Sequence, residues 1–503
     1  MQWIRPGAGW FLAACLAANA GIANGQSATH AGGTSSRLQW ATPAPLLVDD
    51  NAAVHHAGDF MRVAAAAEPA SRDALFGDAP PKNARDALFD ADAPAARASP
   101  RLSGFIDGLA AYTYADPTHW SRAVARLQLT GQGEIGNGVK WKLSGRVDGD
   151  PVYLRSGFYP DAVKRDQRVD FFYRENYIDF SAGDWDFRLG AQQIVWGEVI
   201  GLFFADVVSA RDMREFLLPG FDVIRIPQWA ARAEYTAGNA HVELIFIPVP
   251  AFDRIGKAGS EFYPVPLPSP APNDVLQIFR DPQRPSRSLA NANFGLRANT
   301  LLAGWDLAAF YYRSSSTAPT FYRLPGESPA QPFIVQPRYD RLWQGGGTLG
   351  KDFGDFVLKG EAVYTHGQNF SVADLTAAQS VVGRQTLDYI VSAEWSLPGD
   401  SRVNVQGFQR YYFGGGAGTL AIPNDGVGAS IFLSTKLGIL EPQLLWIRNL
   451  KDGGGLIRPR LSWAAARNIT MSVGADVFTG PSDSFFGRFN NRDRLYTEVR
   501  YDF

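Results

Sequence analysis

The sequence predicts an all-β fold, a transmembrane antiparallel β-barrel of about 18 strands (roughly 16–18). Apolar and polar residues alternate with a period of two from Arg494 to Phe503, the last residues of the chain. Because lipid tolerates no unpaired strand edge, we expect this strand to close a barrel wall. Short and long connections also alternate along the chain, as in outer-membrane barrels. A soluble sandwich that ends on an edge strand is the alternative.

The first 25 residues are expected to form a signal peptide. Arg5 is followed by an apolar stretch from Ala8 to Ala23, with small-x-small cleavage candidates near its end. Leu12 to Cys15 also fits a lipoprotein box, but the apolar run continues past Cys15. No other window approaches 18 consecutive apolar residues, which excludes further membrane-spanning helices.

Residues 26–100 are expected to be a flexible, disordered periplasmic segment, since they are rich in Ala, Pro, Asp and Arg and show no period of two. Within them the motif RDALF occurs twice, at 72–76 and 85–89. Two copies on a flexible tether suggest tandem docking motifs for a periplasmic partner at 71–94. A duplicated linker without a partner is equally compatible with the pattern.

Residues 101–503 are expected to form the barrel. Short turns are predicted near Asn137, Asp184, Asn239, Gly304, Asp355, Gly399, Gly438 and Asn468. Longer polar or Pro-rich segments alternate with them, at about 115–122, 150–170, 197–226, 251–290, 314–337, 366–384, 413–426, 450–455 and 479–491. Short periplasmic turns and longer external loops of these numbers predict about 18 strands.

Tryptophans follow the same division. Five lie near the predicted short turns and would form a periplasmic girdle, namely Trp141, Trp185, Trp305, Trp395 and Trp463. Three border the long loops and would form the opposite girdle, namely Trp120, Trp196 and Trp229. We therefore expect the protein in the outer membrane of a Gram-negative bacterium, in contact with its lipid.

The inward face of the strands is predicted to carry mixed charge. Alternation assigns to the lumen Lys140, Lys142, Arg146, Arg188, Arg232, Glu234, Glu243, Lys359, Glu361, Arg458, Arg460, Glu498 and Arg500. One interpretation is a hydrated pore that orients a polar or anionic solute. The other is a set of ion pairs that brace a lumen filled by loops.

The segment 197–226 is the candidate constriction. Ser209 is expected to cap a short helix that Pro219-Gly220 ends, with Met213, Phe216 and Leu217 on one face. If the segment folds into the lumen, the residues around the constriction are Asp206, Arg211, Asp212, Arg214, Asp222 and Arg225. A lid or a helix on the barrel rim is the alternative.

Composition argues against several other functions. The net charge of −2 does not favour nucleic acid. The six histidines lie in no catalytic or metal-ligand motif, so we expect no enzyme activity, no metal and no cofactor.

The stretch from Trp120 to Tyr235 resembles a family of largely uncharacterised, porin-like proteobacterial outer-membrane proteins, distantly similar to alginate-export-type barrels. The resemblance rests on Gln193-Ile194-Val195-Trp196-Gly197-Glu198, the Arg211–Phe216 loop and Gln228-Trp229. The alternating strand with Tyr501 and terminal Phe503 likewise resembles the insertion signal read by the barrel-insertion machinery. These resemblances imply a barrel for transport or export of small solutes or another compound. The alternative is a non-conducting barrel that anchors an envelope complex through its N-terminal tether.

Overall fold

The computed structural model describes residues 100–199, 204–264, 277–328, 331–372, 380–415, 420–421 and 425–503. The expected signal peptide and, apart from Pro100, the expected flexible segment with its RDALF motifs lie outside these residues.

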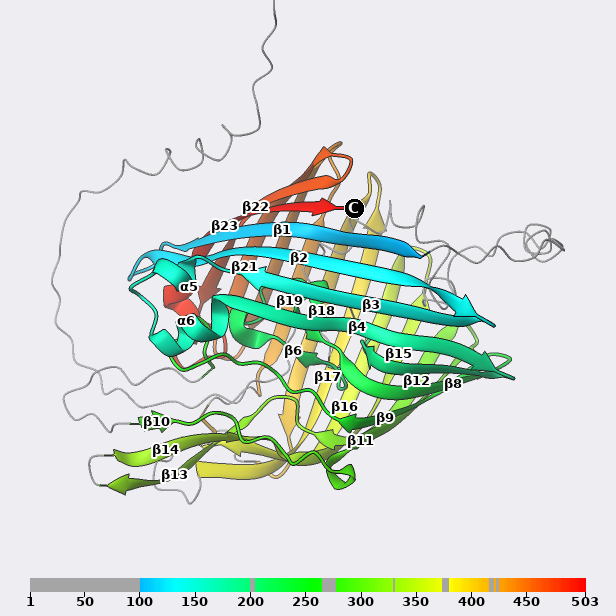
Figure 1. Ribbon diagram of the computed structural model, residues 1–503, viewed down its shortest axis with the longest axis horizontal. Coiled ribbons are helices and arrows are strands. Elements are labelled where there is room, and N and C mark those ends of the chain that lie inside the picture. The colour runs from blue at the N-terminus through cyan, green and yellow to red at the C-terminus, as the bar shows by residue number, and fades with distance from the viewer. Residues whose placement is uncertain are drawn as a thin grey trace, which may run out of the picture. The chain divides into compact units, whose positions relative to one another are not determined.

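Eighteen antiparallel strands form one sheet that closes on itself (Figure 1). They are β1 (Arg101–Thr113), β2 (His119–Gly136), β3 (Val139–Gly149), β4 (Val169–Ala182), β5 (Trp185–Gln192), β8 (Gln228–Ala237), β9 (Ala240–Val249), β11 (Asn293–Leu302), β12 (Trp305–Ser315), β15 (Arg341–Asp352), β16 (Phe356–Ser371), β17 (Val381–Leu397), β18 (Ser401–Tyr412), β19 (Val427–Ser434), β20 (Leu440–Asn449), β21 (Gly455–Ala466), β22 (Ile469–Thr479) and β23 (Arg494–Asp502). The predicted fold class is therefore confirmed.

The seam of the barrel lies between its first and last strands. β1 pairs antiparallel with β2 on one side and with β23 on the other. Beyond that ladder, Gly104 and Phe503 exchange two backbone hydrogen bonds, of 2.8 and 2.9 Å. The strand that the sequence assigns to barrel closure thus closes it.

All eight predicted short turns join neighbouring wall strands. Between β2 and β3, Asn137 and Gly138 both have positive φ, 54° and 75°. This is the pattern of a tight hairpin whose twist matches that of its strands. The nine longer connections lie where the sequence places them, and they carry the remaining elements of the fold.

The two faces of the wall differ in polarity. On β2, Leu127 and Leu129 are 41% and 43% exposed on the outer face of the wall. Arg126, the residue before Leu127, is on the inner face and is buried. Apolar side chains outside and polar ones inside are what a bilayer requires of a spanning barrel. The protein is therefore a β-barrel of the Gram-negative outer membrane. None of the described helices is long and apolar enough to cross a membrane.

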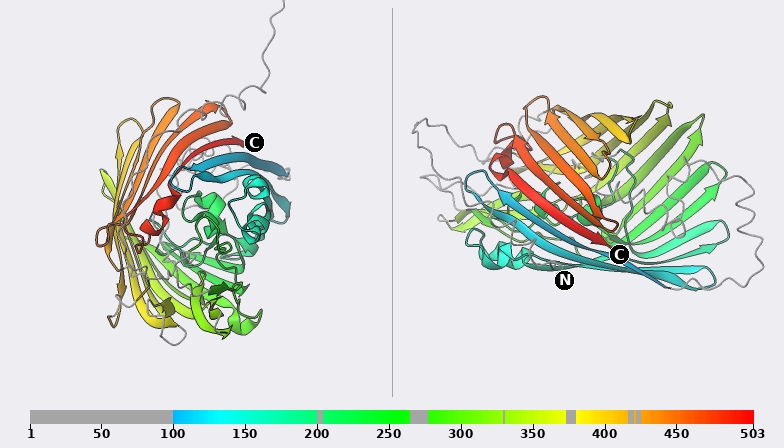
Figure 2. Two further views of the ribbon diagram at one scale, coloured as in Figure 1. Left: turned by 90° about the vertical axis from the view of Figure 1, so that its left-hand side faces the viewer. Right: turned by 90° about the horizontal axis from the view of Figure 1, so that it is seen from above.

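The long connections supply short extra elements. These are α5 (Val152–Arg155), α6 (Asp161–Gln167), β6 (Ala210–Arg211), η1 (Met213–Glu215), α7 (Phe221–Ile224), β7 (Arg225–Ile226), β10 (Gln277–Phe279), η2 (Leu289–Asn291), β13 (Thr320–Ser328), β14 (Gln331–Arg338) and η5 (Gly487–Arg492). β10, β14 and β13 form a separate small sheet, and β6 pairs with β7. The segment between β5 and β8 lies inside the ring of strands (Figure 2).

One of the predicted girdle tryptophans is not at the membrane boundary. Trp120 and Trp229 are 47% and 57% exposed, as a girdle requires, but Trp196 is fully buried. Its indole packs against Phe310 and Tyr312 and donates a hydrogen bond of 3.1 Å to Glu243. The girdle prediction is wrong for Trp196 because the chain leaves the wall after Gln192 and turns into the lumen.

Candidate functional site: the lumen loop

The lumen loop comprises residues 193–227, between β5 and β8. The prediction that Ser209 caps its helix is wrong, since the Ser209 hydroxyl donates to the Ile194 carbonyl at 3.0 Å. β6 extends the chain after Ser209, which delays the helix. Asp212 caps the single turn of η1 instead, its carboxylate accepting from the Arg214 N–H at 3.3 Å.

Apolar side chains fix the loop against the wall. Phe216, Leu217 and Phe221 are all buried in one cluster. From the wall and η5, this cluster includes Ile390, Phe408, Leu445, Ile447, Leu456, Phe478 and Phe489. The apolar surface that the segment was expected to need is therefore the inner surface of the barrel itself.

Eight arginines line the lumen on one side, and we call them the arginine wall. They come from β2, β3, β4, β21 and β23 and are Arg122, Arg126, Arg146, Arg174, Arg458, Arg460, Arg494 and Arg500. Three of them reach carboxylates of the lumen loop. Arg494 and Arg122 lie 2.8 and 3.4 Å from Glu215, and Arg500 lies 2.9 Å from Asp222.

Other arginines of this wall bind the backbone of the loop. Arg458 donates to the Leu218 carbonyl at 3.0 Å, and Arg146 donates to that of Val223 at 3.0 Å. Arg174 donates to the carbonyl of Arg225 at 2.5 Å. Guanidinium groups suit this task because each offers several donors in a fixed geometry.

Carboxylates of the wall balance much of the remaining charge. Asp476 accepts from Arg458 at 2.7 Å and from Arg494 at 2.8 Å. Further pairs join Arg126 to Asp107, Arg122 to Asp150 and Arg460 to Glu498. The arginine wall is therefore committed to ion pairs and to holding the loop.

A carboxylate of β16 holds the loop on the opposite side of the lumen. Glu361 is 3% exposed and accepts four backbone N–H groups of the lumen loop. Those of Val199 and Ala205 lie 2.7 and 2.8 Å from its oxygens. The loop is thus attached on two sides of the lumen, at Glu361 and at the arginine wall.

The six predicted constriction residues form three separate groups. Asp206 lies between Arg211 and Arg225, at 3.6 and 3.3 Å. Asp212 pairs with Arg214 at 2.6 Å, and Arg214 also reaches Asp170 of β4 at 2.8 Å. Asp222 belongs to the third group through its contact with the arginine wall. The structure therefore does not bring the six residues into one ring.

The remaining predicted lumen residues are mostly paired along the wall. Short ion pairs join Lys142 to Glu175, Arg188 to Asp179 and Arg232 to Glu234. Glu243 accepts from Trp196, as described above, whereas Lys359 is half-buried and Lys140 is exposed beside the first short turn. Local pairs of this kind fit the bracing interpretation of the charged lumen.

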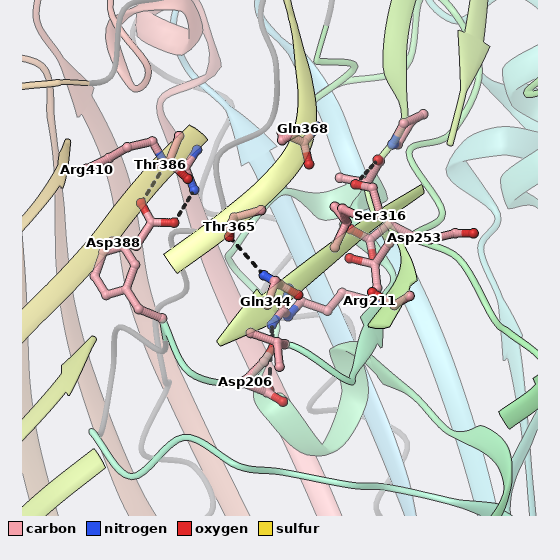
Figure 3. Close-up of a pocket in the computed structure, with 18 of the residues that line it drawn as sticks. Asp206, Arg211, Asp253, Ser316, Gln344, Thr365, Gln368, Thr386, Asp388 and Arg410 are labelled. Atoms are coloured by element: carbon pink, nitrogen blue, oxygen red, sulfur yellow. Dashed lines mark hydrogen bonds and ion pairs between the residues drawn. The ribbon is translucent and has the colours of Figure 1, made fainter. Parts of the chain in front are cut away.

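Cavities border the lumen loop on both of its sides, and one lies between the loop and the wall strands β12, β15, β16, β17 and β18 (Figure 3). It is larger than the cavity on the side of the arginine wall, described below. Its volume is about 90 Å³. The loop contributes Asp206 and Arg211. Uncharged polar side chains of the wall face it, and we call this set the hydroxyl wall, namely Ser314, Ser315, Gln344, Thr365, Gln368 and Thr386.

A smaller cavity, of about 40 Å³, lies on the other side of the lumen loop. Six members of the arginine wall line it together with four carboxylates, Glu215, Asp222, Asp476 and Glu498. Of the predicted constriction residues, Asp222 faces this cavity, and Asp206 and Arg211 face the larger one. The loop therefore separates a highly charged space from a mainly uncharged one.

Sequence reasoning did not find two buried acids in the long connection after β9. Burial raises the pKa of Asp253 to about 6, although the nearby Arg211 opposes that rise. Burial acts in the same direction on Glu261, but hydrogen bonds from His119 and Tyr159 and the charge of Arg492 outweigh it and lower its pKa. No local motif marks either residue, because their partners come from distant segments.

Within the described residues, no group of three or more His, Cys, Asp or Glu side chains is placed to hold a metal ion. The groups that converge in the lumen are those of binding and positioning, namely hydroxyls, amides and paired charges.

No curated protein matches the sequence. Solved structures with a similar course of the chain include OmpF of Salmonella typhi in complex with daunomycin, at 11% identity over 80% of this chain and 97% of that one, with a TM-score of 0.38. OccAB3 of Acinetobacter baumannii matches at 10% identity over 81% and 99%, with a TM-score of 0.47. OmpT of Vibrio cholerae, an outer membrane protein, matches at 8% identity over 80% and 99%, with a TM-score of 0.37. The description of the closed barrel does not depend on these distant likenesses.

A family profile with the description "Protein of unknown function (DUF1302)" matches residues 112–411. These residues run from the end of β1 into β18 and include the whole lumen loop. Because the match covers more than half of the chain, the protein belongs to this family.

Proposed function

We propose that the protein is a porin-like channel of the outer membrane and that the lumen loop constricts it. The observation that carries this proposal is the attachment of the loop on two sides of the lumen, to Glu361 and to the arginine wall. A loop held in this way narrows the lumen of a barrel that its wall side chains alone are too few to fill.

The solute path runs along the hydroxyl wall. The arginine wall is occupied by ion pairs and by the loop, so a solute there would have to break strong interactions. Along the hydroxyl wall, by contrast, neutral donors and acceptors face a cavity. Asp206 and Arg211 are then the constriction residues that the solute meets, and the other four position the loop.

Single-channel conductance in a planar bilayer tests this function. Deletion of residues 204–222 is expected to raise the conductance severalfold, because the loop no longer narrows the lumen. The control is deletion of the exposed residues 286–288, which is expected to leave the conductance unchanged. Equal conductance of the wild type and the 204–222 deletion would contradict the proposed constriction.

The second candidate is a non-conducting barrel that anchors an envelope complex. The apolar cluster and paired charges that fill much of the lumen favour it. A wild-type protein that inserts but carries no current would support this candidate, and binding of a periplasmic partner at 71–94 would then be sought. A role for the barrel-insertion machinery and the resemblance to alginate-export-type barrels stay predictions, as does the expected absence of enzyme activity.

A further inference from the structure

The larger cavity has the composition of a binding site rather than of a gap in packing. Thr365 and Thr386 oppose one another across β16 and β17, and both are buried with their side chains along the cavity (Figure 3). Gln344 of β15 donates to the Thr365 hydroxyl at 3.3 Å. Three adjacent strands therefore present donors and acceptors at one level of the lumen.

Two charged side chains of the lumen loop also line the cavity. Asp206 and Arg211 are only 3% and 4% exposed. Within the described part of the chain, Oδ1 of Asp206 and Nε of Arg211 have no hydrogen-bond partner, but both atoms are buried away from the open volume of the cavity. A solute in the cavity is therefore bound chiefly by the hydroxyl wall.

The formal charges around the cavity are already compensated. Arg410 of β18 binds Asp388 of β17 with two hydrogen bonds, of 2.5 and 2.9 Å. Asp206 lies between two arginines of the loop, and Asp253 accepts a hydrogen bond of 2.8 Å from the backbone N–H of Arg211. An ionic ligand would lack an unpaired counter-charge here, whereas a neutral polar ligand needs none.

The volume of the cavity and its apolar lining narrow the class of ligand further. At roughly 10–15 Å³ for each water-sized position, the cavity of about 90 Å³ has room for about six to nine heavy atoms. Phe204 of the loop and Phe370 of β16 add apolar surface to its lining. Polar groups beside a few apolar faces suit a carbon chain that carries a hydroxyl on each carbon.

We infer that this cavity binds a small neutral polyhydroxylated solute, of the size of a three- or four-carbon polyol. The hydroxyls of such a solute form hydrogen bonds with Thr365, Thr386 and Gln344 and replace water there. The inference rests on the proposed function, since it names the solute class of the same channel.

The experiment uses the full chain in proteoliposomes. Sodium chloride conductance is measured first, and then the initial rates of entry of labelled erythritol, succinate and 1,4-diaminobutane. We expect erythritol entry to be the fastest and to saturate. The double variant Thr365→Val/Thr386→Val is expected to raise the half-saturating erythritol concentration about tenfold, for the loss of two hydrogen bonds.

Three further variants make the result specific. Thr386→Ser keeps the hydroxyl and is expected to retain wild-type saturation. Ser316→Ala removes another hydroxyl that lines the cavity and is expected to raise the half-saturating erythritol concentration about threefold. It replaces the double variant as the test if the double variant does not fold. Thr130→Val removes a hydroxyl that does not line the cavity and that lies 2.8 Å from the Ser144 hydroxyl. This variant is expected to leave the half-saturating erythritol concentration unchanged.

The outcomes separate the two proposals. Absence of conductance in the inserted wild type overturns the proposed function. The inference is overturned, and the channel proposal stands, if the protein conducts but succinate or 1,4-diaminobutane enters faster than erythritol. The same holds if neither Thr365→Val/Thr386→Val nor Ser316→Ala changes the half-saturating erythritol concentration.

Discussion

The arginine wall and the hydroxyl wall face one another across the same lumen but use polarity differently. On the arginine wall, guanidinium groups bind carboxylates and loop carbonyls at 2.5 to 3.6 Å, and several of them hold the lumen loop in place. On the hydroxyl wall, uncharged groups border a cavity. The difference indicates that strong charge fixes the loop, while neutral polarity leaves space beside it.

The strongest challenge to this division is Glu361, a buried carboxylate that binds the loop from the side of the hydroxyl wall. Glu361→Ala leaves four buried backbone N–H groups without an acceptor. We expect a loss of about 4 kcal/mol in the free energy of unfolding, since each orphaned donor costs about 1–3 kcal/mol and the effects do not add fully. Denaturant unfolding in detergent micelles measures it, and a loss below about 1 kcal/mol would show that the arginine wall alone retains the loop.

The arginine wall itself is tested at Asp476, which is fully buried between Arg458 and Arg494. Asp476→Asn keeps the shape but leaves two buried cations without their shared carboxylate. We expect a loss of about 3 kcal/mol by the same unfolding measurement, because breaking a buried pair strands a charge. If Asp476→Asn leaves the free energy of unfolding unchanged, these arginines are in contact with water. The arginine wall would then hold the loop less by charge than we infer.

Steric fit of the loop is tested at Gly295 of β11. A Cβ at this position would lie 2.6 Å from the Trp196 ring and 2.9 Å from that of Tyr312. Gly295→Ala is expected to cost about 2 kcal/mol by overpacking and to lower the thermal midpoint. The matched control is Gly108→Ala on β1, where a Cβ meets no atom within 4 Å. Equal midpoints for the two variants would mean that Trp196 is free to shift.

The pH dependence of stability is tested at Asp253. Its folded pKa of about 6 lies above the usual value of about 3.9, so the folded state binds this proton first as the pH falls. The contribution of Asp253 to stability is therefore fully present below about pH 4 and is lost as the pH rises through about 6. We expect the wild type to lose about 1–2 kcal/mol more than Asp253→Asn between pH 4 and 7. Parallel stability profiles of the two proteins would contradict this.

The smallest effect is expected on the uncharged side of the lumen. Ser392 of β17 accepts a hydrogen bond of 3.0 Å from the Asn404 amide, and both are buried. Ser392→Ala is expected to cost about 1 kcal/mol, the net value of one neutral hydrogen bond. If this variant costs as much as Asp476→Asn, then charge is not what distinguishes the two walls.

Strand alternation and turn residues were sufficient to predict the barrel, because each strand shows its own alternation of apolar and polar residues. The eight turns follow from local residues such as Asn137-Gly138. The lumen could not be predicted in the same way. Glu361 binds backbone groups 157 and 162 residues away, and Trp196 packs against Phe310 and Tyr312 of β12. Contacts between such distant segments leave no period or spacing in the sequence.

The seam between β1 and β23 links the wall of the barrel to the segment inside it. Arg494 and Arg500, which bind the lumen loop, both belong to β23, and β23 also pairs with β1 to close the ring of strands. One strand therefore completes the wall and holds the loop, so a change that displaces β23 alters closure and constriction together.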